Sequence, residues 1–135
     1  MHWVIKDLKN CKKIYRKLVA ATPLGEDYMR EGAILSKKRK NNSYLAVCLF
    51  DKNELIGWSM LDFFLSKDSH ATRTYIYVKT KFRRKKFGTK ILTKVKKVAA
   101  QLNKKIKVIP HNRASLKFFK SNKIQKNEIV RGYKY

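Results

Sequence analysis

The chain is poor in cysteine, in acidic side chains and in long apolar runs. Its two cysteines, Cys11 and Cys48, stand alone in apolar patterns, and its three histidines lack the spacing of zinc ligands. We therefore expect two buried thiols in a reducing compartment, with no disulfide framework and no metal site. No stretch approaches the roughly 20 apolar residues of a membrane span, and the first residues lack the pattern of a signal peptide. These absences predict a cytoplasmic protein without membrane association.

Acidic residues are scarce: nine Asp and Glu stand against 34 Lys and Arg, which gives a formal net charge of +25. One explanation is solubility combined with a general lysine bias, because the lysines are dispersed and far outnumber the arginines. The other is a polyanionic partner, namely RNA, DNA, a ribosome or a strongly acidic protein. No zinc finger or aromatic RNA-binding pattern decides between them, so the sequence leaves both open.

Apolar content is nevertheless that of a folded protein. Hydrophobic residues make up 44% of the chain and aromatic residues 12%, which argues against intrinsic disorder. The sequence has no internal repeat and no low-complexity linker, and 135 residues suffice for one core. We therefore predict a single domain spanning 1–135.

Hydrophobic periodicity predicts alternating strands and helices. Residues 2–6 begin a strand, and Asp7 is placed to cap a helix running to about Ala21. Two nearly continuous apolar runs, 44–50 and 55–65, predict central strands joined by a hairpin turn. Gly57 within the second run marks either a bulge or a small residue beneath a helix. The first helix should turn Leu8, Cys11, Tyr15 and Leu18 inward. The other expected elements are a short helix within 26–42, a polar loop at 66–73, a strand at 75–78, a helix at 87–102, a strand at 105–111, a helix from 112 and a strand at 128–135.

The most informative segment joins the strand at 75–78 to the helix at 87–102. A cationic loop, Lys79-Thr-Lys-Phe-Arg-Arg-Lys-Lys, lies between them, and Gly88 stands at the helix start. A strand, a basic loop and a helix N-terminus together favour phosphate binding, because unpaired N–H groups and the positive end of the helix dipole face the anion. The alternative is an ordinary solvated loop. The apolar face expected for this helix comprises Phe87, Ile91, Val95, Val98 and Leu102.

A second motif follows downstream. Residues 105–111 alternate like a half-buried strand and lead into Asn112-Arg-Ala-Ser-Leu-Lys-Phe-Phe, with Asn112 as a helix N-cap. Together the two motifs resemble the GCN5-related N-acetyltransferase (GNAT) family over roughly the C-terminal half. The family's phosphate loop, Arg/Gln-x-x-Gly-x-Gly/Ala, is matched at Arg83, Lys86 and Gly88. Its second pattern, Asn-x-Ala-Ser-x-x-Phe/Leu-Tyr-x-x-x-Gly-Phe, falls on Asn112, Ala114, Ser115, Phe118, Phe119, Lys123 and Ile124.

The resemblance implies an α/β (α+β) GNAT fold, with a mixed central sheet splayed between the fourth and fifth strands and flanked by helices. It also implies acetyl-CoA as cofactor, with its pantetheine arm along the fourth strand and its pyrophosphate in the cationic loop. Phe118 would help to line the channel. The cofactor-binding residues that it implies are Ile76, Val78, Arg83, Arg84, Lys85, Lys86, Phe87, Gly88, Thr89, Asn112, Ser115 and Phe119.

Three positions depart from the family pattern. Lys86 replaces the first loop glycine, so it either adopts a normal φ or compensates through its ammonium group. Phe119 replaces the tyrosine that protonates the departing thiolate, and Lys123 and Ile124 replace the closing Gly-Phe. We expect an oxyanion to be stabilised by a backbone N–H near Val78 or Lys79. The catalytic candidates are Tyr133 and His111, with Tyr75 and Tyr77 as further acids and Asp62, Glu54 and His70 as further bases.

Two functions remain open from the sequence. The first is an acetyl-CoA-dependent N-acetyltransferase that acts on a protein lysine, an N-terminus or a nucleic-acid-associated target, favoured by the Arg83–Gly88 frame and Asn112. The second is a catalytically silent GNAT-like basic module that binds nucleic acid or an acidic protein, favoured by Lys86 and Phe119. Small lysine-rich proteins of this kind are also encoded by bacteriophages, which would place the protein in the host cytoplasm or the virion.

Overall fold

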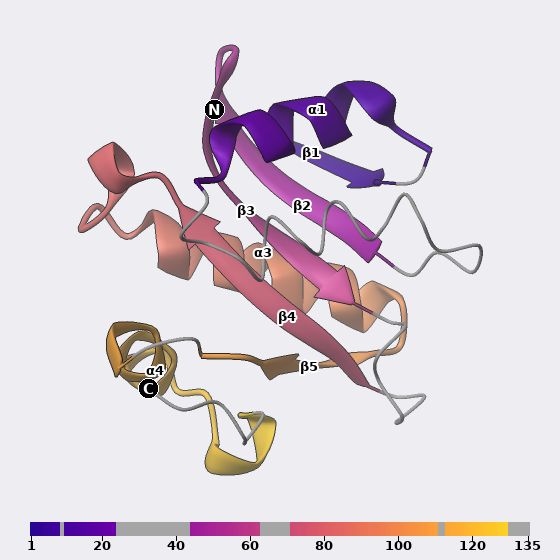
Figure 1. Cartoon of the computed structure of the whole chain (residues 1–135). Coiled ribbons are helices and arrows are strands. Elements are labelled where there is room, and N and C mark those ends of the chain that lie inside the picture. The colour runs from indigo at the N-terminus through magenta and orange to yellow at the C-terminus, as the bar shows by residue number, and fades with distance from the viewer. Residues whose placement is uncertain (9, 24–43, 63–70, 111–112, 130–135) are drawn as a thin grey trace.

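The computed structural model describes residues 1–8, 10–23, 44–62, 71–110 and 113–129 (Figure 1). Five strands form one sheet in the order β1-β2-β3-β4-β5, antiparallel except for the parallel pair β4–β5. This is the mixed sheet that the sequence predicted. The helix expected within 26–42 lies outside the described residues. The elements are β1 (His2–Asp7), α1 (Lys12–Ala21), β2 (Tyr44–Asp51), β3 (Glu54–Asp62), β4 (Ala71–Val78), α3 (Phe87–Gln101), β5 (Lys105–Val108) and α4 (Arg113–Ser121), with short 3₁₀ turns at Thr80–Phe82 and Lys126–Glu128.

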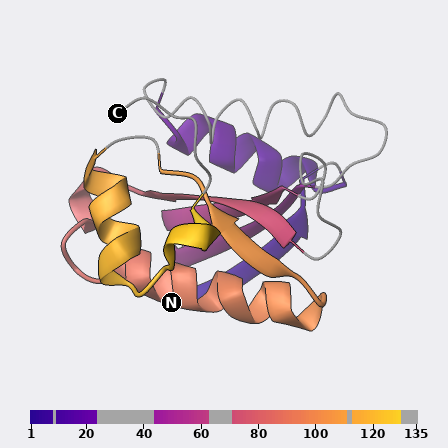
Figure 2. The same ribbon diagram turned by 90° about the horizontal axis from the view of Figure 1, so that it is seen from below.

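Helices cover both faces of the sheet, with α1 and α3 on opposite sides (Figure 2). The central strands β2 and β3 are buried on both faces, as their continuous apolar runs predicted. Trp58 of β3 is fully buried against α1, and its Nε1–H donates to Thr22 Oγ1 at 3.0 Å just after that helix. None of the described helices has the length and apolar character needed to cross a membrane. The α3 side of the core includes Val47, Leu49, Ile56, Leu61, Ile91, Leu92, Val95, Ile106, Val108 and Phe119.

Helix α1 begins later than predicted, because Asp7 does not cap it. Asp7 ends β1, where its backbone carbonyl accepts from Asn10 N–H at 3.2 Å and its carboxylate accepts from Asn10 Nδ2 at 2.9 Å. These two bonds make a turn before the helix starts at Lys12. Of the predicted inward residues, Leu8 and Leu18 are buried while Cys11 and Tyr15 are only half-buried; Ile14 completes the stripe.

The two cysteines differ in burial. Cys48 lies fully buried in β2, and burial raises the pKa of its thiol. Cys11 stands half-buried at the start of α1, so the expectation of two buried thiols is met only by Cys48.

Several other boundaries differ from the sequence prediction. Residues 71–73, expected in a polar loop, belong to β4, because their backbones pair with β5 and Arg73 pairs with β3 as well. Leu102 follows the end of α3 and is 47% exposed, so it is not part of the apolar face. Leu92 and Ala99 are buried there instead.

Strand β5 is shorter than predicted, and the described start of the last predicted strand differs from the prediction. Strand β5 ends at Val108, and Pro110 soon after it has no N–H to donate to a ladder. Glu128 belongs to a 3₁₀ turn, in which its carboxylate accepts from Gln125 N–H at 2.8 Å. The predicted strand therefore does not begin at Glu128: Ile129 forms a single parallel bridge with Val108. Residues 130–135 lie outside the described residues.

Strand β5 pairs only with the first half of β4. Their register runs from Ala71↔Lys105 to Thr74↔Val108, and Ile109 N–H then donates to the Thr74 carbonyl at 3.2 Å. On its other edge β4 remains paired with β3 as far as Val78. The sheet is therefore splayed between its fourth and fifth strands, as the resemblance implied.

Gly57 lies where β3 supports the splayed half of β4. Opposite it, the β2–β3 register shifts between Leu49 and Phe50, so that Ile56 is the extra residue of a bulge. A Cβ on Gly57 would lie 2.5 Å from the Tyr77 carbonyl oxygen and 2.9 Å from Ile91 Cδ1 of α3. Both interpretations of Gly57 therefore hold, since it adjoins a bulge and lies beneath a helix.

Gly57→Ala should lower the free energy of unfolding by about 1–3 kcal/mol, because the new methyl group pushes β4 away from β3. Adding Ile91→Val, which removes Cδ1, should not rescue it, since the closest atom belongs to the Tyr77 backbone. Urea unfolding of both single variants and the double variant measures this. A double variant as stable as Ile91→Val alone would contradict the backbone explanation.

Candidate functional site

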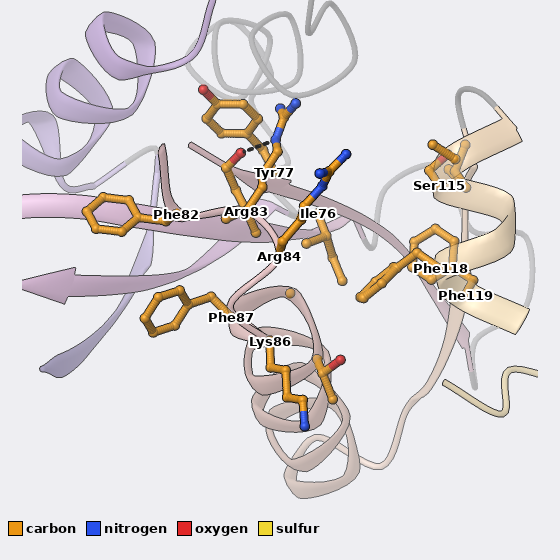
Figure 3. Close-up of a pocket in the computed structure, with 15 residues that line it drawn as sticks. Ile76, Tyr77, Phe82, Arg83, Arg84, Lys86, Phe87, Ser115, Phe118 and Phe119 are labelled. Carbon is orange, nitrogen blue, oxygen red and sulfur yellow. Dashed lines mark hydrogen bonds between the residues drawn. The ribbon is translucent and has the colours of Figure 1, made fainter. Parts of the chain in front are cut away.

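A cavity of about 470 Å³ lies beside the splayed end of β4 (Figure 3). Strand β4 forms one wall, the cationic loop and the start of α3 form a second, and α4 forms a third. The lining residues are Ile76, Tyr77, Val78, Phe82, Arg83, Arg84, Lys86, Phe87, Gly88, Thr89, Ile109, Ala114, Ser115, Phe118 and Phe119.

The backbone of β4 has hydrogen-bonding groups directed toward the splay. Lys79 N–H donates to the Ile56 carbonyl on the β3 side at 2.9 Å, whereas the Thr74 carbonyl accepts from Ile109 N–H, just after β5. Since these directions alternate along a strand, Ile76 and Val78 direct their backbone groups to the side that β5 has left. Of the two N–H groups expected to serve an oxyanion, that of Lys79 is therefore occupied by β3, and that of Val78 faces the splay.

Helix α3 begins without a side-chain cap. Its N-cap residue, Lys86, makes no capping hydrogen bond, and the first turn contains no acidic residue. The first intrahelical bond of α3 joins Lys90 N–H to the Lys86 carbonyl at 3.1 Å, so the N–H groups before Lys90 are not used by the helix ladder. Cations at Arg84 and Lys86 add to the positive end of the dipole. This combination is unfavourable without an anion and favours binding one.

The loop before α3 has an unusual backbone. Arg84 and Lys86 have φ values of 63° and 64°, in the left-handed region that glycine adopts most readily. The alternative in which Lys86 adopts a normal φ is therefore wrong. Left-handed residues within a tight turn direct successive N–H groups into a concavity suited to anions. Compensation through the Lys86 ammonium group stays a prediction.

The arginine side chains are arranged differently from Lys86. Arg83 Nε donates to the Val78 carbonyl at 2.9 Å, and its guanidinium carbon lies 5.9 Å from the centre of the Tyr77 ring. Figure 3 shows Arg83 and Arg84 pointing to one side while Lys86 points the other way, along α3. Arg83 thereby satisfies the Val78 carbonyl, while the Val78 N–H stays directed toward the cavity.

Phenylalanines make the wall opposite β4 apolar. The Phe118 and Phe119 rings lie 5.4 Å apart between centroids, and Phe119 is only 2% exposed. A Cβ on Gly88 would be 3.1 Å from the Phe118 ring. Glycine at this position therefore lets α4 pack closely on the first turn of α3.

Most of the predicted cofactor residues meet in this cavity. Lys85 is exposed and does not line it, and Asn112, His111 and Tyr133 lie outside the described residues. Phe82 and Ile109 were missed. A signal existed for Phe82, the only apolar residue in the cationic loop, and its ring packs edge-on against Phe87 at 6.0 Å. The predicted residues that line the cavity are Ile76, Val78, Arg83, Arg84, Lys86, Phe87, Gly88, Thr89, Ser115 and Phe119.

The further acid and base candidates are mostly elsewhere. Glu54 is paired with Lys81, whose hydrogen bond and charge lower the pKa of the carboxyl group, and it lies outside the cavity. Asp62 ends β3 at its far end, where its backbone is in register with Arg73 of β4. Tyr75 and Tyr77 both pack in the core on the α1 side, and Tyr77 also lines the cavity. His70 lies outside the described residues. Within the described part of the chain, no carboxylate lines the cavity.

Comparison with known proteins gives a match to the model of the acetyltransferase (GNAT) family over residues 8–122. No curated protein matches significantly. Among solved structures, Tetrahymena GCN5 has a TM-score of 0.72 at 13% identity, covering 100% of this chain and 91% of that chain. An aminoglycoside acetyltransferase from an uncultured soil metagenomic sample, in complex with sisomicin, has a TM-score of 0.67 at 14% identity. The match covers 99% of this chain and 95% of that chain. An aminoglycoside 6'-N-acetyltransferase complexed with coenzyme A has a TM-score of 0.61 at 18% identity. The match covers 80% of this chain but only 61% of that chain.

Lys86→Gly should raise the free energy of unfolding by about 1 kcal/mol, because glycine adopts the left-handed conformation without the steric cost that lysine has. Lys85→Gly is the matched control: it also removes one exposed charge from the loop, but Lys85 is not in the left-handed region. Urea unfolding of the two variants measures the difference. Equal stability changes would attribute the effect to charge and not to the backbone.

Proposed function

Because the chain belongs to the GNAT family of acetyltransferases, we propose that it transfers the acetyl group of acetyl-CoA to a primary amine. One observation carries the proposal. Among the described residues, the cavity beside splayed β4 combines a strand edge without a partner strand, an uncapped helix N-terminus with cations, and an apolar wall. These are the three kinds of surface that a pantetheine arm, a pyrophosphate and an acetyl group require.

The residues present fit acetyl-CoA, which supplies an activated thioester when bound. Ile76 offers backbone groups to the amides of the pantetheine arm. The N–H groups of Phe87, Gly88 and Thr89 would hold the pyrophosphate, and Arg84 would add positive charge. The proposed roles of Lys85, Lys86 and Ser115 are supporting contacts, and Asn112, outside the described residues, is proposed for the pantetheine.

Val78 is proposed to stabilise developing negative charge. Its carbonyl is already bonded to Arg83, while its N–H faces the splay, so this N–H can donate to the acetyl carbonyl oxygen as the amine attacks. Phe118, Phe119 and Ile109 keep that region apolar, which strengthens such a hydrogen bond. Alignment of the two reactants supplies a further large part of the rate.

Proton transfer is the weak point of the site. Phe119 has no hydroxyl to donate, and the proposed residues His111, as base, and Tyr133, as acid, lie outside the described residues. Tyr77 is a second candidate acid, since it lines the cavity. Phe119 is also the observation that favours the second candidate function, a GNAT-like basic module without catalysis.

We propose that the acceptor amine belongs to a macromolecule, either a protein lysine or N-terminus or a nucleic-acid-associated target. Arg83 and Arg84 are exposed while lining the cavity, and the chain has a net charge of +25. A cationic small amine would be repelled at this opening, whereas an amine on an anionic partner would be attracted.

Acetyl-CoA should raise the melting temperature of the protein, by an amount equivalent to about 2.7 kcal/mol at one hundred times the Kd. Gly88→Glu should abolish the shift, because its carboxylate would face the pyrophosphate and its Cβ would crowd Phe118. Lys97→Gln is the matched control: it also lowers the net charge by one, on an exposed position of α3 that does not line the cavity. Thermal unfolding and titration calorimetry measure the effect. No shift of the wild type at millimolar acetyl-CoA would exclude the enzyme.

Phe119→Tyr should raise turnover, by roughly a hundredfold if protonation of the thiolate limits the rate. The change adds one hydroxyl to a ring that lines the cavity. Phe118→Tyr, which adds the same hydroxyl one residue earlier, should not. Initial rates of CoA release with a panel of amines test this. If all three proteins bind acetyl-CoA but none releases CoA above background, the domain is a binding module and not an enzyme.

A further inference from the structure

The positive charge of the chain is concentrated in one continuous stretch. No Asp or Glu occurs from Ser69 to Asn127, while 19 of the 34 Lys and Arg residues do. The stretch contains β4, α3, β5 and α4, the elements that follow β3. Cations on these elements therefore have no acidic neighbours from their own part of the chain.

Helix α3 displays part of this charge on its outward face. Lys90, Lys94 and Lys97 follow a spacing of four and three residues, which puts them in one row along the helix beside the buried face that contains Ile91 and Val95. We call these three residues the α3 lysine stripe. At a rise of 1.5 Å per residue the stripe spans about 10 Å, with neighbouring lysines about 5–6 Å apart. Lys90 and Lys97 are exposed, and the half-buried Lys94 has its ammonium 5.7 Å from the centre of the Trp3 ring.

The stripe is not neutralised within the described part of the chain. The ion pair found there joins Lys81 to Glu54 and involves no residue of α3. Like charges at this spacing destabilise a helix by about 0.2–0.5 kcal/mol per pair. The cofactor cavity does not account for them either, because none of the three lines it.

We propose that the α3 lysine stripe binds the phosphate backbone of a nucleic-acid duplex without sequence preference. Lysine ammonium groups act as point charges for phosphates. Helix α3 contains no arginine, which is the residue of choice for bidentate recognition because of its planar guanidinium fork. The lysines of α3 are therefore better suited to phosphates than to sequence readout.

The same face is unsuited to the two competing polyanions. Single strands bind by stacking bases on exposed aromatic rings, but every Trp, Tyr and Phe side chain described by the structure is buried or half-buried. Protein partners need apolar anchors at the centre of an interface. Among the described residues the exposed large apolar side chains are Met1, Ile5 and Leu102, and none of them lies within α3. A duplex requires neither feature.

The test is fluorescence anisotropy with a labelled 20-bp duplex, as DNA and as RNA, from low to physiological salt. The wild type should bind both, with a Kd that rises steeply with salt. The variant Lys90→Gln/Lys94→Gln/Lys97→Gln removes three phosphate contacts. It should lower the slope of log Kd against log salt by about 2–3 and weaken binding on the order of tenfold or more. Removing like-charge repulsion should leave this variant at least as stable as the wild type, which a melting curve checks.

The matched control is Lys12→Gln/Lys13→Gln/Arg16→Gln, which removes three exposed charges from α1 on the opposite face of the sheet. This control should change the slope of log Kd against log salt by less than the amount expected for about one phosphate contact. An equal loss in both triple variants would overturn the proposal, since net charge alone would then explain binding. So would the absence of binding at low salt, tighter binding of the matching single strand, or equal competition by polyglutamate.

Discussion

The parting of β5 from β4 after Thr74 is the constraint on which the rest of the structure depends. Beyond this point the backbone groups of Ile76 and Val78 have no strand partner on one side within the described part of the chain, and a buried backbone group left unpaired costs about 1–3 kcal/mol. Arg83 satisfies one of them through its bond to the Val78 carbonyl. Thr74 itself has a buried hydroxyl without a hydrogen-bond partner in the described residues. The cavity therefore arises because a β-ladder ends early, with α3 and α4 closing around the exposed edge.

Sequence patterns sufficed where local chemistry decides. The basic loop, the α3 apolar face and the mixed sheet followed from periodicity and from the two GNAT motifs, and family, fold and most elements agree with them. Patterns failed where a long-range contact or a single bond decides. Asn10 bonds twice to Asp7 and delays α1, and backbone pairing with β5 extends β4 into a polar segment. The left-handed φ of Lys86 could not be read from a lysine at all, since glycine alone signals that conformation.

Helix α3 shows how packing and charge divide one element. Burial of a Val, Leu or Ile side chain contributes about 1.5–3 kcal/mol to stability. Ile91, Leu92 and Val95 are all buried, each at most 2% exposed. Repulsion between neighbouring lysines is several times smaller for each pair. The inward face therefore decides that the helix forms, and the outward face tolerates an arrangement of charge that would be unfavourable in an isolated peptide. Function can act on the outward face without endangering the fold.

The early end of the β4–β5 ladder also bears on the order of folding. Strands β2 and β3 are joined by a two-residue turn, with Lys52 at a φ of 55°, and such hairpins form in roughly 1–10 μs. The parallel pair β4–β5 needs the whole of α3 as a crossover, and contacts so distant along the chain form slowly. The cavity takes its walls from both sides of that crossover. We therefore expect the binding site to be the last region to assemble, on a sheet whose central hairpin is already in place.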